Sequence, residues 1–186
     1  MHDHTHRFAP PDSAPGTAAG PGKDGHCGPV KLLCDEMLQG LGRWLRAAGY
    51  DTAIAGRGLP DRGLLRRALV EGRVVLTCDR ELAARTDADG RVVTLSANGL
   101  DATARELRDG MGIDWLHAPF TRCLVDNAVL RPAARIHRAG VPPQARALGV
   151  AINACPACGR VYWPGSHVRR MRARLESWQR PGPSSR

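Results

Sequence analysis

Three aspartates stand at positions from which their carboxylates could meet at one edge of a folded sheet. Asp35 directly follows the apolar segment KLLC, Asp79 follows VVLT with one residue between, and Asp61 opens a stretch with helical periodicity. The carboxyl ends of parallel strands share one edge, where open α/β sheets hold their functional sites. Carboxylates gathered there repel one another unless a hard cation such as Mg²⁺ or Mn²⁺ neutralises them. Such a cation can polarise a phosphodiester and activate water, so the pattern indicates metal-dependent phosphate chemistry.

Each of these acids also has a purely structural explanation. Asp61 stands where a helix N-cap is expected. Asp79 precedes a predicted helix with Glu81 in its first turn, where acidic residues are favoured electrostatically. Taken singly, capping explains each aspartate better than catalysis does. Taken together at one sheet edge, with Glu36 beside Asp35 and Glu81 beside Asp79, they favour a catalytic site.

A second group that could do chemistry is the segment CPACG, from Cys155 to Gly159. Two cysteines at this spacing followed by glycine are typical of a zinc knuckle, in which backbone N–H groups point at the thiolates. With Cys123 upstream, they predict a structural Zn²⁺ site. The alternative is a thiol redox pair of Cys155 and Cys158. The residues before them do not have the pattern of a thioredoxin-like strand, which counts against that alternative.

The apolar pattern predicts the elements that position these side chains. Strands are expected at 31–34, 50–55, 74–77 and 92–96, and helices after Asp35 and at 61–71, 79–85 and 100–111. This alternation implies an α/β domain over 30–117 with a mostly parallel sheet and helices on both faces. A lobe with an Arg-rich terminal helix is expected over 118–180. Residues 1–29, rich in Pro and Gly, predict a disordered tail, and 181–186 a frayed end.

The charge is distributed unevenly along the chain. The net charge is +9 with a pI of about 10.1, and the surplus lies in residues 118–186, which hold 12 Arg against Asp126 and Glu176. Residues 31–117 are neutral overall. Arginine forks bind phosphate bidentately, so the last third is expected to meet a polyanion such as RNA. A genome that favours arginine everywhere would explain the excess less well, because the middle of the chain is balanced. No apolar run suits a membrane span or a signal peptide, so a soluble, cytoplasmic protein is expected.

Four stretches of the chain resemble, in order, the Mut-seven C-terminal ribonuclease domain family. They are CDEMLQGLGRWLRAAGYDT, PDRGLLRRALVEGRVVLTCDREL, PFTRCLVDN and CPACGRVYWPGSHVRRM, and the resemblance covers roughly residues 31–175. It implies a PIN-like three-layer domain with a mostly parallel sheet, followed by a small zinc-ribbon-like lobe and a basic terminal helix. It also implies ribonuclease activity, which periodicity and spacing alone do not give.

The resemblance transfers site roles by position. It implies a Mg²⁺ or Mn²⁺ site of Asp35, Asp61 and Asp79, with Glu81 or Glu36 completing it. The candidates for contact with RNA are all arginines expected on polar helix faces, although such residues are more often simply solvated. They are Arg43, Arg46, Arg169, Arg170, Arg172 and Arg174.

The sequence departs from the family's pattern in the ribbon. The position expected to pair with Cys123 in a first C-x-x-C holds Asp126. Three cysteines and one carboxylate can still close a tetrahedral Zn²⁺ site. His137 or His167 could instead supply the fourth ligand, or the site has decayed.

The function predicted from these features is metal-dependent hydrolysis of RNA phosphodiester bonds. The alternative is a non-catalytic RNA- or ribosome-binding zinc-ribbon protein whose acidic site is vestigial.

Overall fold

The computed structural model describes residues 29–84, 91–96, 98–135, 140–147 and 149–181. The predicted disordered tail up to residue 28, the predicted frayed end from 182 onward and the alternative zinc ligand His137 lie outside the described residues. No helix within the described ranges combines the length and the apolar composition needed to cross a membrane.

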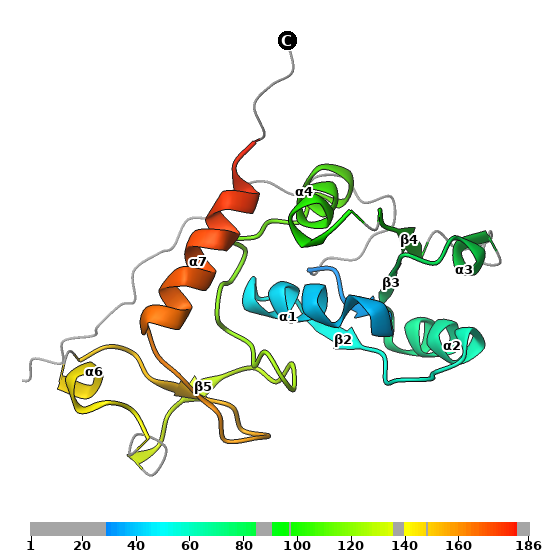
Figure 1. The fold of residues 1–186 in the computed structure, drawn as a ribbon. Helices are drawn as coiled ribbons and strands as arrows, with labels where there is room; N and C mark the ends of the chain where they lie inside the picture. Colours follow the sequence, from blue (N-terminus) through cyan, green and yellow to red (C-terminus); the bar gives the residue numbers. More distant parts are fainter. Residues whose placement is uncertain (1–28, 85–90, 97, 136–139, 148, 182–186) are drawn as a thin grey trace, which may run out of the picture.

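The first part of the chain forms a four-stranded parallel sheet (Figure 1). Its strands are β1 (Leu32–Cys34), β2 (Thr52–Ile54), β3 (Val74–Thr77) and β4 (Val92–Thr94), in the order β2-β1-β3-β4. All neighbouring pairs are parallel, which confirms the predicted α/β fold. The second and fourth strands are shorter than the apolar runs that predicted them. Because β1 and β3 are the two central strands, the residues that follow them lie side by side.

Helices cover both faces of this sheet. A short 3₁₀ turn η1 (Glu36–Leu38) leads into α1 (Gln39–Ala47), and α2 (Asp61–Glu71), α3 (Arg80–Ala84) and α4 (Leu100–Met111) follow. Alternate strand residues point to opposite faces. Leu32 and Leu76 pack with α1 and α4, whereas Leu33 and Val75 pack with α2 and α3. The sheet is therefore the middle of three layers, which explains why its strands are apolar on both faces.

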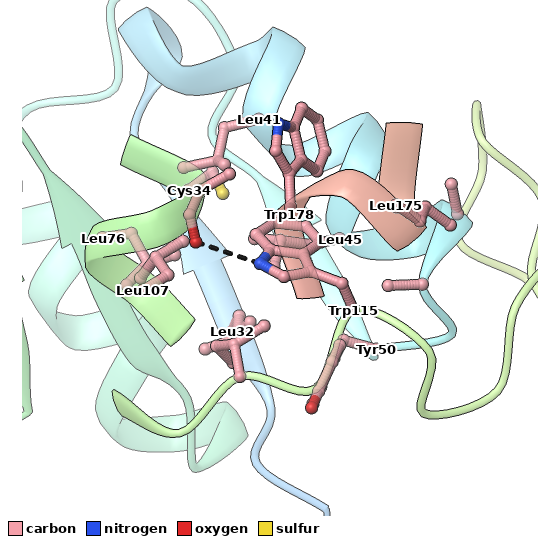
Figure 2. Close-up of a cluster of buried hydrophobic side chains, with 14 of the residues drawn as sticks. Leu32, Cys34, Leu41, Leu45, Tyr50, Leu76, Leu107, Trp115, Leu175 and Trp178 are labelled. Atoms are coloured by element: carbon pink, nitrogen blue, oxygen red, sulfur yellow. Dashed lines mark hydrogen bonds between the residues drawn. The ribbon is translucent and has the colours of Figure 1, made fainter. Parts of the chain in front are cut away.

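The terminal helix α7 (Ser166–Gln179) packs on the α/β core. Its buried residues Met171, Leu175 and Trp178 join the core between the sheet, α1 and α4. The Trp178 ring meets those of Trp44 and Trp115 edge-on, with centroids 4.8 and 4.9 Å apart. Figure 2 shows the buried core around Trp115 and Trp178, in which the indole N–H of Trp115 donates to the Ala104 carbonyl at 3.0 Å. The Arg-rich helix thus completes the core of the α/β domain rather than a core of the lobe.

The residues between α4 and α7 form a smaller lobe. Its antiparallel sheet contains β5 (Arg131–Pro132), β6 (Asn153–Ala154) and β7 (Val161–Tyr162), and α6 (Pro143–Ala147) lies in the β5–β6 connection. A small core forms from Ala133, Val141, Ile152 and Ala154. With so little apolar surface to bury, the lobe depends on other interactions for its stability.

The start of the lobe is held against the end of α1. Ala118 and Phe120 donate their N–H groups to the carbonyls of Ala48 and Ala47 at 2.9 and 2.8 Å. Gly49 lies between these segments with φ +102°, and a Cβ there would collide with the Ala118 carbonyl. Glycine at 49 therefore ends α1 and also allows the lobe segment to approach.

Candidate acidic and metal sites

Asp35 and Asp79 lie at the carboxyl ends of the two central strands. The strand register pairs Cys34 with Leu76, which brings Asp35 level with Thr77 one residue later. The Thr77 hydroxyl donates to Asp35 Oδ2 at 2.9 Å and accepts the N–H of Asp79 at 3.0 Å. One buried hydroxyl therefore fixes the positions of both aspartates. Thr77 was not predicted as a site residue, because a threonine at the end of the apolar segment VVLT cannot be told from an ordinary strand residue.

Both aspartates also cap the turn that follows them. Asp35 Oδ1 accepts the N–H of Glu36 at 2.6 Å. Asp79 Oδ1 accepts the N–H groups of Glu81 and Leu82 at 2.7 and 3.3 Å. The capping explanation is therefore correct for one oxygen of Asp79. Its other oxygen, Oδ2, makes no hydrogen bond to a described residue, and the side chain is exposed.

The other predicted acids lie around this edge with different surroundings. Asp61 was predicted as the N-cap of α2, but it is the first helical residue and the N-cap is Pro60. Glu36 accepts the N–H of Gly58 at 2.8 Å and so holds the β2–α2 loop against η1. An open hollow of about 390 Å³ lies beside it, lined by Glu36, Met37, Gln39, Arg57 and Gly58.

The acidic residues do not by themselves form a closed cage for a metal. Among the described residues, one group of at least three potential metal ligands lies close enough together to share an ion. It is in the lobe, and it contains none of Asp35, Asp61 and Asp79. Mg²⁺ commonly takes one or two protein carboxylates and keeps waters or phosphate oxygens for its other positions. Asp35 and Asp79 fit that pattern of a partial, open site.

The converging group contains the four residues expected to bind zinc, Cys123, Asp126, Cys155 and Cys158, with ligand atoms all within 4.8 Å of one another. The Sγ atoms of Cys123 and Cys158 are 3.8 Å apart. Asp126 Oδ2 lies 3.4 Å from the Sγ atoms of both Cys123 and Cys155. Zn–S and Zn–O bonds of about 2.3 and 2.0 Å in a tetrahedron place ligand atoms about 3.5–3.8 Å apart. The four residues fit Zn²⁺, and His167, exposed in the first turn of α7, is not among them.

Cys123 and Cys155 begin two knuckles with the same hydrogen bonds. In each, the cysteine N–H donates to the carbonyl five residues later, and its carbonyl accepts the N–H four residues later. These bonds join Cys123 to Ala128 and Asn127, and Cys155 to Arg160 and Gly159, at 2.8 to 3.0 Å. Asn127 and Gly159 both have positive φ, 66° and 72°, a conformation that glycine and asparagine adopt most readily. Asp126 therefore occupies in the first knuckle the place that Cys158 occupies in the second.

The ligands influence one another's protonation. Burial alone would raise the pKa of the Cys123 thiol, but hydrogen bonds from the Tyr162 hydroxyl and from the backbone of Asp126 and Val125 lower it below its usual value. Asp126 accepts a hydrogen bond from Cys158 and raises the pKa of that thiol to about 12. A cation that replaces this proton would satisfy both groups.

The chain matches the sequence profile of the Mut7-C RNAse domain over residues 30–175. It belongs to the Mut7-C RNAse domain family. The resemblance carried by the four sequence stretches is thus confirmed. The human exonuclease mut-7 homolog is 45% identical over 47 residues, which are 25% of this chain and 5% of that protein. The chain therefore spans only a small part of that relative's length. No solved structure matches the chain.

The predicted RNA-contacting arginines of this Mut7-C domain lie in different surroundings. Arg43, Arg169 and Arg170 are exposed. The guanidinium of Arg172 lies over the Phe120 ring, 5.5 Å from its centroid.

Arg174 is already engaged within the Mut7-C domain. It pairs with Asp101 at 2.9 Å and lies over the rings of Trp44 and Trp178, 5.5 and 5.3 Å from their centroids. Asp101 also accepts the indole N–H of Trp178 at 2.7 Å. Arg174 therefore helps to hold α7 against α4, whatever else it contacts.

Arg46 does not lie on the polar side of its helix, and that prediction is wrong. Only 6% of the residue is exposed, because the lobe of the Mut7-C domain packs over this part of α1. Its Nε donates to Thr52 O at 2.8 Å, and its Nη1 donates to the carbonyls of Leu124 and Val125 at 3.0 and 2.6 Å. Helical periodicity predicts that an arginine faces solvent. It gives no information about the segment around Leu124, which packs on Arg46 from 78 residues away in the sequence.

Proposed function

We propose that this Mut7-C domain is a metal-dependent ribonuclease with a PIN-like α/β domain, which hydrolyses RNA phosphodiester bonds at the carboxyl edge of β1 and β3. The observation that supports this most directly is the Thr77 hydroxyl, which bonds to Asp35 and Asp79 at the ends of adjacent strands. Membership of a ribonuclease domain family supports RNA as the substrate.

Asp35 and Asp79 would hold Mg²⁺ or Mn²⁺, with Asp61, Glu36 and Glu81 as the neighbouring acids. When bound, such a cation neutralises charge on the phosphate and lowers the pKa of an attacking water. Thr77 keeps the Asp35 carboxylate in one orientation, and the caps of η1 and α3 fix one oxygen of each aspartate. The other oxygen of Asp79, Oδ2, makes no hydrogen bond to a described residue, and the side chain is exposed. It is therefore accessible to a cation and to substrate from solvent.

The lobe and α7 would bind the RNA and fix the position of the RNA relative to the acidic edge. The described lobe carries several exposed arginines, namely Arg131, Arg135, Arg146 and Arg160, and α7 adds Arg169 and Arg170. Zn²⁺ held by Cys123, Asp126, Cys155 and Cys158 would have a structural role, since four protein ligands leave no open position for substrate.

The deciding experiment incubates the purified chain with single-stranded and structured RNA in the presence of Mg²⁺, Mn²⁺ or EDTA. The proposal expects cleavage with either cation and none with EDTA. Protein that binds RNA but never cuts it under any of these conditions would favour the non-catalytic RNA-binding alternative, which the arginine-rich lobe would also support.

A further inference from the structure

Arg46 of α1 reaches from the α/β domain into the first metal knuckle. Its guanidinium is buried, and all of its hydrogen bonds go to backbone carbonyls, one on β2 and two between the ligands Cys123 and Asp126. The two knuckle carbonyls, of Leu124 and Val125, both bind the same nitrogen, Nη1.

These carbonyls belong to the peptide units whose N–H groups face the metal ligand. The Leu124 carbonyl shares a peptide unit with the N–H of Val125, and the Val125 carbonyl shares one with the N–H of Asp126. The Asp126 N–H donates to Cys123 Sγ, at 3.4 Å, and the Val125 backbone also hydrogen-bonds that thiol. In a trans peptide the C=O and N–H point in opposite directions. A cation on the carbonyl side therefore turns both N–H groups toward the sulfur.

We propose that Arg46 is a positioning residue of the metal site, which holds the Leu124 and Val125 carbonyls so that two backbone N–H groups point at the Cys123 thiolate. Metal binding in the lobe is thereby coupled to the α/β domain. This inference rests on the proposed Zn²⁺ site and does not depend on nuclease activity.

Asn127 makes a second link between the same two parts of the molecule. Its side-chain carbonyl accepts the N–H of Thr52 at 3.0 Å, and its amide donates to Asp51 Oδ1 at 2.7 Å. Asn127 follows the ligand Asp126 directly, so the knuckle that holds the metal also caps the edge strand β2.

The charge on Arg46 is explained by what it faces. Taking a guanidinium out of water is costly, and its hydrogen bonds to the Thr52, Leu124 and Val125 carbonyls offset part of that cost. Three thiolates and a carboxylate carry more negative charge than one Zn²⁺ neutralises, so a cation behind the knuckle compensates the excess.

A comparison of two arginine-to-lysine variants of the full chain tests this role. Arg46→Lys keeps the charge but loses the planar fork, in which Nε binds Thr52 O while Nη1 binds the two knuckle carbonyls. The matched control is Arg108→Lys, because Arg108 of α4 also donates to distant backbone carbonyls, those of Trp178 and Arg180, far in sequence from the knuckles. Zinc affinity is measured by competition with a chromophoric chelator, and folding by thermal unfolding of each variant.

We expect Arg46→Lys to weaken zinc binding by about tenfold or more and Arg108→Lys by less than about twofold, as for loss of a group that orients a ligand. In the Co²⁺-substituted protein, the thiolate-to-metal charge-transfer band should shift in Arg46→Lys alone. Equal zinc affinity of Arg46→Lys and the wild-type chain would overturn the proposal.

A second measurement needs no variant and so does not depend on one folding. The Thr52 amide is protected by Asn127, whereas the Leu95 amide, which donates to Thr77 O, lies at the other edge of the sheet. Coupling is reciprocal, so removing zinc should speed hydrogen exchange of the Thr52 amide by about tenfold and leave that of Leu95 nearly unchanged. Identical exchange at Thr52 with and without zinc would also overturn the coupling. A chain that binds no zinc would exclude both the metal site and this role of Arg46, whether or not it cleaves RNA.

Discussion

The Thr77 hydroxyl lies 2.9 Å from Asp35 Oδ2, across two neighbouring parallel strands. A hydroxyl has one proton to donate, and here it goes to the carboxylate, because the oxygen of the same hydroxyl accepts the Asp79 N–H. Asp35 Oδ2 is therefore a hydrogen-bond acceptor, as Oδ1 is for the Glu36 N–H. This hydrogen bond joins the ends of β1 and β3 through a side chain. Removing it therefore tests whether the position of Asp35 matters for cleavage.

Thr77→Val is expected to lower kcat by about tenfold or more with little change in KM. Valine fills the same volume, but it frees the Asp35 carboxylate and leaves the Asp79 N–H without its acceptor, which also costs about 1–3 kcal/mol of stability. Thr77→Ser should restore most of kcat. Steady-state cleavage kinetics measure the effect. The control is Thr103→Val, which removes hydroxyl bonds to Ser96 O and Gly99 O at the start of α4 and should leave kcat unchanged.

Asp79→Asn is expected to lower kcat by about 10³-fold while the melting temperature stays nearly unchanged. Asparagine retains an oxygen that can cap α3, so the change removes the charge and not the cap. Metal-bound carboxylates support several kcal/mol of barrier lowering, at about 1.36 kcal/mol per factor of ten. Asp114→Asn is the matched control. Asp114 Oδ1 accepts the N–H of Leu116 at 2.8 Å, and this residue is not at the acidic edge of the sheet. Wild-type activity in Asp79→Asn would leave that residue with capping alone.

Patterns within single elements were enough to predict the parallel sheet and its acidic edge. The alternation of apolar strands and amphipathic helices fixes which residues follow β1 and β3, so Asp35 and Asp79 could be placed side by side. Thr77 could not be identified, because its role depends on the register between two strands. Arg46 was misplaced for a related reason, since its partners lie in a lobe more than 70 residues away. Interactions between distant segments leave no periodic signal in the sequence.

The purified chain is expected to contain about one zinc per molecule, as four ligands of one structural site imply. Cys155→Ser should release it, and Asp126→Ala should weaken binding less than that. Because Asp126 occupies the place of Cys158 in an equivalent knuckle, Asp126→Cys should tighten the site. Elemental analysis and chelator competition provide the measurements. Absence of zinc from protein purified without chelators would rule the site out.

Asp51 is expected to make stability depend on pH in the acid range. Burial alone would raise its pKa, but hydrogen bonds from Arg73 and Asn127, both at 2.7 Å, and the charge of Arg73 lower it below the usual value. A carboxyl with a depressed folded-state pKa stabilises the fold above its unfolded-state pKa of about 3.9. This stabilisation is lost as the pH falls through the lower folded-state value.

Asp51→Asn should therefore lower the free energy of unfolding at neutral pH by on the order of 1–3 kcal/mol. The difference from wild type should shrink as the pH is lowered to about 3. Urea unfolding at matched zinc content measures it across that range. Asp109→Asn, at an exposed ion pair with Arg108, should show almost no difference at any pH. If the difference in free energy of unfolding between Asp51→Asn and wild type does not change with pH, the charge of Asp51 contributes nothing to stability.

Arg169 and Arg170 are expected to carry more of the RNA affinity than Arg172 and Arg174. All four residues are exposed, but the guanidiniums of Arg172 and Arg174 lie over aromatic rings, whereas no such contact occupies Arg169 and Arg170 among the described residues. Changing Arg169 and Arg170 together to Gln should reduce the log–log salt slope of single-strand binding by about 1.4, at roughly 0.7 per phosphate contact. KM should rise much more than kcat falls, because binding away from the reacting bond is largely uniform.

A matched pair on another helix separates this effect from a general loss of charge. Arg62 and Arg66 are exposed on α2, and changing both to Gln removes the same charge but should leave the salt slope nearly intact. Arg174→Gln should instead lower the melting temperature, since it breaks the ion pair with Asp101. If the Arg169 and Arg170 variant keeps the wild-type slope and KM, the basic end of α7 does not hold RNA. Its charge would then serve an acidic protein partner or solubility, and the substrate would be bound at the rim of the acidic edge near Arg43.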